Sequence, residues 1–256
     1  MKSISLYVDK KTFVHDADPI TKLYYVAFAI LVSVAAPDLR VSAACAVLSI
    51  GLLAAARVLK NAAPMFAFAL FVLVTIVVIQ GLVGADNKTP AFSLFGLVFY
   101  REGLMTSVFV ALRVINFIGA FLILVLTAKP PDLVEDLVKA GLSPRIGYVI
   151  ISIFQIIPQM MTAADTITDA QRSRGMETQG NLIVRMKAFV PLMGPVAINA
   201  FLNTRERAMA LEVRAFSSGS KKSFLHEREP YPPAKLLRIL FTACIAGAIV
   251  WRIAAL

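Results

Sequence analysis

The segment MFAFALFVLVTIVVIQGLVG, residues 65–84, contains no charged residue and has the length of a membrane-spanning helix. A span needs about 20 mostly apolar residues, because the hydrocarbon core of a bilayer is about 30 Å thick and an α-helix rises about 1.5 Å per residue. A segment of this kind in the interior of the chain indicates an integral membrane protein.

The composition agrees with this interpretation. Of the 256 residues, 58% are hydrophobic and only 16% are charged, whereas soluble domains have about 45–50% apolar and about 25% charged residues. A disordered chain is excluded because apolar residues are abundant. A disulfide scaffold is excluded because there are two cysteines, Cys45 and Cys244, both within apolar runs, where we expect them to act as small buried hydrophobic residues.

Four more apolar segments flank residues 65–84, and together they predict an all-α polytopic membrane protein with about five transmembrane helices. The shortest segment reaches 17 residues only if its helix begins at Ile20 and Lys22 extends its amine to the membrane surface. The net-neutral loop Ala85–Gly103 is expected on the outside. The four segments are Leu23–Ala36, Val41–Ala56, Leu104–Thr127 and Lys235–Ala255.

Two further segments are ambiguous. Ile146–Ala163 is uncharged, and Leu182–Leu202 is apolar but contains two basic residues and two prolines. The helical pattern of Arg145–Arg174 corresponds to a helix about 45 Å long. Either both segments cross the membrane, with Asp165–Asn181 outside, or both belong to a cytoplasmic region. The final span has the same direction in both cases.

The distribution of charge favours the cytoplasmic interpretation. The net charge is +10, and Ala170–Arg238 holds most of the excess of lysine and arginine, as expected for a cytoplasmic segment. Lysines near the amino terminus place that end inside. We therefore predict a multi-pass protein of the inner (plasma) membrane with three parts: a four-span membrane domain at 1–127, a cytoplasmic-side region at 128–234 and a last span at 235–256. Nucleic-acid binding is not expected, because the chain lacks a basic-aromatic module.

The sequence offers little for catalysis. It has no phosphate-binding GxxxxGK[ST] loop and no zinc-ligand spacing. His15 and His226 are isolated and are expected to be solvated loop residues. Asp165 and Asp169 lie near Arg172 at the spacing of helical ion pairs. We expect no enzyme activity and no catalytic, cofactor-binding or metal-binding residues.

A near-repeat is the most informative local feature. Residues 170–175, AQRSRG, and 210–215, ALEVRA, both place an alanine four residues before an arginine and a small residue after it. Alanine and arginine then share a helix face, and arginine offers five donors to carboxylates or carbonyls of a partner. The alternative is that both arginines anchor to lipid phosphates. The candidate residues are Ala170, Ser173, Arg174, Gly175, Ala210, Val213, Arg214 and Ala215.

Two features within the apolar segments also have two interpretations. Arg113 and Asn116 lie inside Leu104–Thr127. They could line a polar path, or pair with an acid of a partner subunit. Alternatively, they could be satisfied within the bundle, or at the lipid headgroups. The small residues of 42–46 and 54–56 could contact a partner helix or pack internally.

Four segments, in order, resemble the transmembrane (T) component of energy-coupling factor (ECF) transporters, the family that includes the cobalt-transporter permease subunit. Asp18–Leu23 resembles the family's Asp-Pro-Arg-x-Lys-Leu opening, with Ile20 in the place of the arginine. The other three resemble its three coupling helices, of which the last two end in Ala-Arg-Gly-like triplets. They are Pro130–Gly141 followed by Leu142–Arg145, Phe154–Gly175, and the segment ending Arg214–Phe216.

The resemblance implies four amino-terminal spans, three cytoplasmic-side coupling helices and one last span. It implies a scaffold that transmits the ATP-driven motion of two ABC-type ATPase subunits to a small substrate-binding membrane subunit for vitamin or transition-metal uptake, with Arg174 and Arg214 coupling to the ATPases. The alternative is a conventional ABC importer permease that forms its own substrate path.

Overall fold

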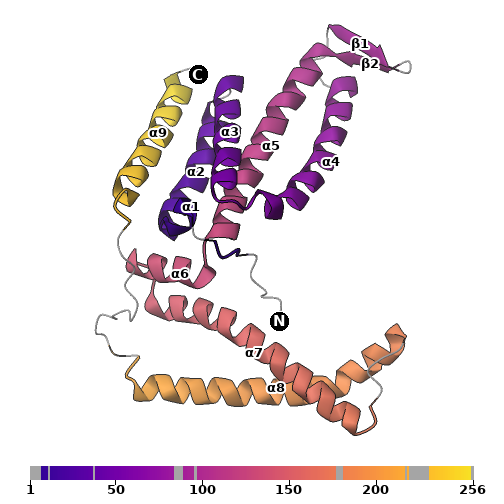
Figure 1. The fold of residues 1–256 in the computed structure, drawn as a ribbon, viewed down its shortest axis with the longest axis vertical. Helices are drawn as coiled ribbons and strands as arrows, with labels where there is room; N and C mark the ends of the chain where they lie inside the picture. Colours follow the sequence, from indigo (N-terminus) through magenta and orange to yellow (C-terminus); the bar gives the residue numbers. More distant parts are fainter. Residues whose placement is uncertain are drawn as a thin grey trace. The chain divides into compact units, whose positions relative to one another are not determined.

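The computed structural model describes residues 7–10, 12–36, 38–83, 89–94, 97–176, 181–216, 218 and 231–254. His226 and the lysines at positions 2 and 11 lie outside these residues. The chain forms two compact units, 1–136 together with 228–256, and 137–227 (Figure 1).

The first unit is a helical bundle with one small hairpin (Figure 1). α5 packs against α2, α3 and α4, and α9 packs against α2. Between α4 and α5 lies an antiparallel pair of strands, which hydropathy does not predict because the strands have only five and four residues. The elements are α1 (Phe13–Asp16), α2 (Pro19–Ala35), α3 (Leu39–Ala55), α4 (Leu59–Val83), β1 (Pro90–Leu94), β2 (Leu97–Tyr100), α5 (Arg101–Thr127) and α9 (Ala234–Ala254).

The second unit is built on α7 (Pro144–Ser173) and α8 (Leu182–Val213). α6 (Pro130–Lys139) crosses the boundary between the two units. The helix predicted over Arg145–Arg174 therefore exists with almost those bounds, and the helix that begins at Leu182 continues beyond its apolar part to Val213.

In the part of the chain that the structure describes, α4, α5, α7 and α9 are long and apolar enough to cross a membrane. α2 and α3 are apolar but have 17 residues each, the lower limit for a span. The prediction of an all-α membrane protein is confirmed. The number of five spans stays a prediction, because α7 is also long and apolar enough to cross the membrane.

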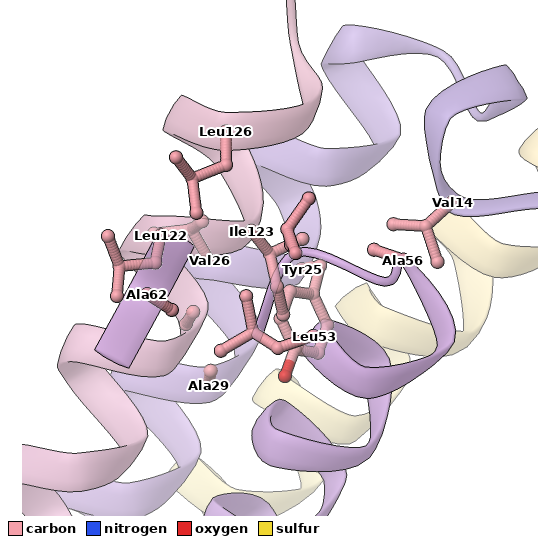
Figure 2. Close-up of a cluster of buried hydrophobic side chains, with 12 residues drawn as sticks. Val14, Tyr25, Val26, Ala29, Leu53, Ala56, Ala62, Leu122, Ile123 and Leu126 are labelled. Atoms are coloured by element: carbon pink, nitrogen blue, oxygen red, sulfur yellow. The ribbon is translucent and has the colours of Figure 1, made fainter. Parts of the chain in front are cut away.

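Apolar side chains of this bundle point both inward and outward. Figure 2 shows Tyr25 of α2, Leu53 of α3 and Ile123 of α5 meeting in the core, where Leu53 is fully buried. On the outside, Phe68 and Phe71 of α4 are exposed. A helix that is apolar on all sides belongs in lipid, because no polar face is left for water.

The base of the bundle is held by Lys22. Its side chain is buried, and its amine donates to the carbonyl oxygen of Thr127 at 2.9 Å and to that of His15 at 3.2 Å. These carbonyls lie in the last turns of α5 and α1, where the helix dipole favours a cation. The helix begins at Pro19, so the span of 17 residues exists, and the Lys22 amine is satisfied by carbonyls at the ends of two neighbouring helices.

The same segment also holds the last helix. Arg238 of α9 donates to a carboxylate oxygen of Asp18 at 3.1 Å and to the hydroxyl oxygen of Thr21 at 3.1 Å. The segment that resembles the family opening therefore joins α2, α5 and α9. Ile20 stands between these residues in the sequence and has no charge with which to take part in such contacts.

His15 is not the solvated loop residue that was expected. It lies in α1, where its Nε2 donates to the carbonyl oxygen of Val8 and its Nδ1 contacts the hydroxyl of Thr12. Burial lowers the pKa of His15, which favours the neutral ring.

A polar network ties three helices together inside the apolar core. Asn116 of α5 donates to the carbonyl oxygen of Ala29 in α2 at 2.8 Å and accepts from the hydroxyl of Ser49 in α3 at 2.7 Å. The hydroxyl of Tyr25 lies 2.7 Å from the same Ser49 oxygen. Asn116 is therefore satisfied within the bundle, which agrees with one of the two interpretations given for it above.

Replacing Asn116 by leucine should destabilise the protein by about 1–3 kcal/mol, because the carbonyl of Ala29 and the hydroxyl of Ser49 lose a partner in a site without water. The free energy of unfolding, measured by denaturant titration in detergent, checks this. Thr75→Val is the control, since the Thr75 hydroxyl bonds only its own helix, at Phe71. Equal stability of the two variants would contradict the structural role of the network.

Candidate functional site

α7 and α8 pack side by side in opposite directions (Figure 1). The ring of Tyr148, near the start of α7, lies 5.3 Å from the ring of Phe216, just beyond the end of α8. Gln159, near the middle of α7, accepts a hydrogen bond from Arg207, about two turns before the end of α8. The end of one helix therefore lies near the beginning of the other.

α7 ends in a Schellman motif, the hydrogen-bonded turn that closes many helices. The backbone N–H of Met176 donates to the carbonyl of Gln171 at 3.1 Å, and that of Gly175 donates to the carbonyl of Arg172 at 2.9 Å. Gly175 has φ +87°, a left-handed conformation that glycine adopts without strain. Arg174 is the last residue before this turn, so its position at the tip is determined by the motif.

α8 ends in the same way. The N–H of Phe216 donates to the carbonyl of Leu211 at 3.0 Å, and that of Ala215 donates to the carbonyl of Glu212 at 2.9 Å. Ala215 has φ +54°, which is strained for a residue with a Cβ atom. Arg214 therefore occupies the same position in α8 as Arg174 does in α7, and the near-repeat in the sequence corresponds to a repeated local structure.

α6 shows that the turn alone does not distinguish a site. It also ends in a Schellman motif, with Leu142 bonded to Leu137, Gly141 bonded to Val138 and Gly141 at φ +121°. Ala140 stands where the other two helices have arginine. The feature specific to α7 and α8 is the cation at the tip.

Both arginines are exposed. In the described part of the chain, no hydrogen bond or ion pair of either guanidinium is found, whereas the neighbouring Arg172 pairs with Asp169 at 3.3 Å. The cations lie at helix carboxyl ends, where the unsatisfied carbonyls favour positive charge. Each tip therefore presents a guanidinium with its donors available to a partner.

The other candidate residues surround the two arginines. Ala170 and Ala210 are exposed one turn earlier, Ser173 uses its hydroxyl to bond the carbonyl of Asp169, and Val213 is 88% exposed.

The sequence pattern did not single out Met176 and Phe216. Both directly follow the left-handed residue and are partly buried, as is usual for the apolar residue after a Schellman turn. An apolar residue after Arg-Gly or Arg-Ala is the signal that could have identified them.

The two tips are far apart. Because Phe216 contacts Tyr148, Arg214 lies near the start of α7, about 26 residues before Arg174. At about 1.5 Å per residue, this corresponds to about 39 Å along the helix. This separation exceeds the diameter of one small domain, which is about 30 Å.

The middle of the helix pair mixes polar and apolar side chains. A hollow of about 30 Å³ there is large enough for a water molecule. Its lining is polar at Gln159, Asn199, Asn203, Thr204 and Arg207 and apolar at Ile156, Met160, Ala163, Val196 and Ala200.

The fold and its exposed tips define a helical membrane protein with a paired, cationic helical unit. Comparison with known proteins narrows this class. The family described as cobalt transport protein (CbiQ) matches residues 10–224, so the chain belongs to that family.

Curated relatives extend over most of the chain. It is 30% identical over 239 residues to the energy-coupling factor transporter transmembrane protein EcfT of Clostridium kluyveri, covering 88% of this chain and 87% of the relative. It is 29% identical to that of Staphylococcus aureus, over 86% and 85% of the two chains. For Bacillus subtilis the identity is 28%, over 86% of each. These relatives are named as transporter components and not as enzymes, and the chain is a transmembrane transporter component.

Exchanging glycine and alanine at the left-handed residue should have opposite effects on the stability of the two helix ends. Gly175→Ala should weaken the α7 turn by about 1 kcal/mol, because a Cβ is disfavoured at positive φ although it meets no atom within 4 Å. Ala215→Gly should strengthen the α8 turn by a similar amount. Hydrogen exchange, read by mass spectrometry, should become about fivefold faster at Met176 and about fivefold slower at Phe216.

Gly194→Ala is the matched control for this experiment. Gly194 lies inside α8, where an added methyl group would meet no atom within 4 Å. The same substitution should therefore slow exchange there, since alanine favours helix. If Gly175→Ala also slowed exchange, the left-handed turn after Arg174 would be contradicted.

Proposed function

We propose that this chain is the coupling scaffold of an energy-coupling factor importer. Two ABC-type ATPase subunits bind Arg174 and Arg214, one at each tip. The chain passes their ATP-driven motion to a small substrate-binding subunit in the membrane, for uptake of a vitamin or a transition-metal ion. The proposal places the chain in the inner (plasma) membrane with its amino terminus in the cytoplasm.

The observation that carries the proposal is that α7 and α8 end in the same turn with an exposed arginine at the same position. An arginine that only anchors to lipid needs no defined helix end. A guanidinium that enters a protein groove does, because its planar fork binds carboxylates or carbonyls in one orientation.

The distance between the tips supports two separate ATPase subunits. About 39 Å along α7 is more than one groove can bridge, and the antiparallel packing directs the two carboxyl ends away from each other. Approach of the two ATPases on ATP binding would then change the angle between α7 and α8.

The polar contact between Gln159 and Arg207 in the middle of the pair suits such a change of angle. Side chains such as Gln159 and Arg207 can exchange partners with water, whereas a tightly interdigitated apolar seam resists sliding. The two helices then act as rigid levers that pivot near these residues.

Small residues on the outside of the membrane helices are proposed to contact the substrate-binding subunit. Ala44 of α3 and Ala243 and Gly247 of α9 are exposed, and small residues allow close approach of helices in lipid. Ser42 and Ala46 are buried and therefore serve the bundle. The division at 1–127, 128–234 and 235–256 is retained as the proposed assignment of membrane and coupling parts.

Arg174→Ala and Arg214→Ala should each weaken ATPase binding by about 1.5–3 kcal/mol, the usual contribution of a hydrogen bond to a charged group, or about 10- to 150-fold. The double variant should be clearly worse. Co-purification of the ATPase subunits with the tagged chain, followed by ATP-dependent uptake in vesicles, checks this.

Arg172→Ala and Arg205→Ala are the controls, because both residues are exposed arginines on the same two helices but lie before the tips. They should leave ATPase binding within about twofold of wild type. Wild-type uptake by the double tip variant would refute the proposal. Recovery of a dimer of this chain with two ATPases and no small membrane subunit would instead favour the conventional permease.

A further inference from the structure

Arg113 is a charged residue near the middle of a membrane helix. It lies 12 positions after Arg101 and 14 before Thr127, the two ends of α5, or about 18 Å and 21 Å along the axis. Charged side chains at this depth are energetically unfavourable and usually mark a functional site. Neither the coupling tips nor the core network makes use of Arg113.

The structure satisfies the side chain only in part. The guanidinium carbon lies 4.2 Å from the ring centroid of Phe109, one turn earlier on the same helix. The Nε atom is enclosed and has no hydrogen-bond partner, while the two terminal nitrogens are not enclosed. In the described part of the chain, no ion pair of Arg113 is found. The ring holds the guanidinium in place without neutralising it.

The described membrane helices of this unit offer no carboxylate at that depth. The sequences of α2, α3, α4 and α9 contain no aspartate or glutamate, and that of α5 contains only Glu102. Glu102 lies at the first turn of α5, where its carboxylate accepts from the N–H and the hydroxyl of Thr89.

We propose that Arg113 binds a carboxylate on a transmembrane helix of the substrate-binding subunit, which docks against α5 beside Phe109. The two terminal nitrogens match a carboxylate as a bidentate pair. A second copy of this chain has no acid to offer from these helices, and a lipid phosphate belongs at the headgroups, about 15 Å from the bilayer centre. A protein carboxylate at mid-depth is the remaining complement.

This inference rests on the proposed function, because it assumes that the chain holds a substrate-binding membrane subunit. The inference about Arg113 can fail while the proposed function stands, because in that proposal binding of the ATPases depends on Arg174 and Arg214 and not on α5. The experiment therefore measures the two kinds of subunit separately.

The test uses the complete complex, purified through a tag on the ATPase. Arg113→Ala should reduce the amount of substrate-binding subunit per ATPase by at least tenfold while leaving the ratio of this chain to ATPase unchanged. Arg113→Lys should retain an intermediate amount, because it keeps the charge and loses the fork. Arg101→Ala is the matched control, an exposed arginine at the start of the same helix, and should behave as wild type.

A photo-crosslinking amino acid in place of Phe117, one turn after Arg113, then identifies the neighbour. The expected product is a membrane-helix peptide of the substrate-binding subunit with an acid within one turn of the crosslink. Replacing that acid by arginine together with Arg113→Glu should restore binding. A crosslink to phospholipid, to a second copy of this chain or to a peptide without an acid would overturn the inference, as would unchanged subunit retention in Arg113→Ala.

Discussion

A bilayer offers no hydrogen-bond partner to a backbone N–H or C=O group. The membrane part of this chain must therefore be helical, and every helix leaves four unsatisfied carbonyls at its end. The structure satisfies these carbonyls in two ways. At the base of the bundle, the amine of Lys22 binds carbonyls that end α5 and α1. In the second unit, left-handed turns close α7 and α8. The helix ends are thus the places where charge gathers, and the proposed coupling residues are among them.

Two polar residues three positions apart on α5 show how packing decides the role of a side chain in lipid. Asn116 meets Ala29 and Ser49 and is satisfied, so it holds the bundle together. Arg113 meets an aromatic ring of its own helix and no carboxylate among the described residues, so we propose that another subunit supplies its partner. The first is a structural residue because its partners belong to the same chain. The second is a candidate interface residue because the described residues offer it no carboxylate.

The two helix tips differ in one respect that matters. Gly175 adopts its left-handed conformation freely, whereas Ala215 adopts it against a steric penalty of about 1 kcal/mol. The α8 tip keeps its shape because the turn is bonded at both Glu212 and Leu211 and because Phe216 packs on Tyr148. The same arginine position is therefore maintained by backbone preference in one helix and by packing in the other.

The sequence by itself determined the class of protein and much of the helix pattern. Long apolar segments can be satisfied only in lipid, so Met65–Gly84 and its neighbours predicted a helical membrane protein, and the near-repeat around Arg174 and Arg214 marked the candidate tips. Only the tertiary structure decided which polar residues are satisfied. Lys22 is buried because the carbonyls that it binds come from helices that end beside it. Such partners are distant in sequence, as for Lys22 and Thr127, and hydropathy carries no information about which helices meet.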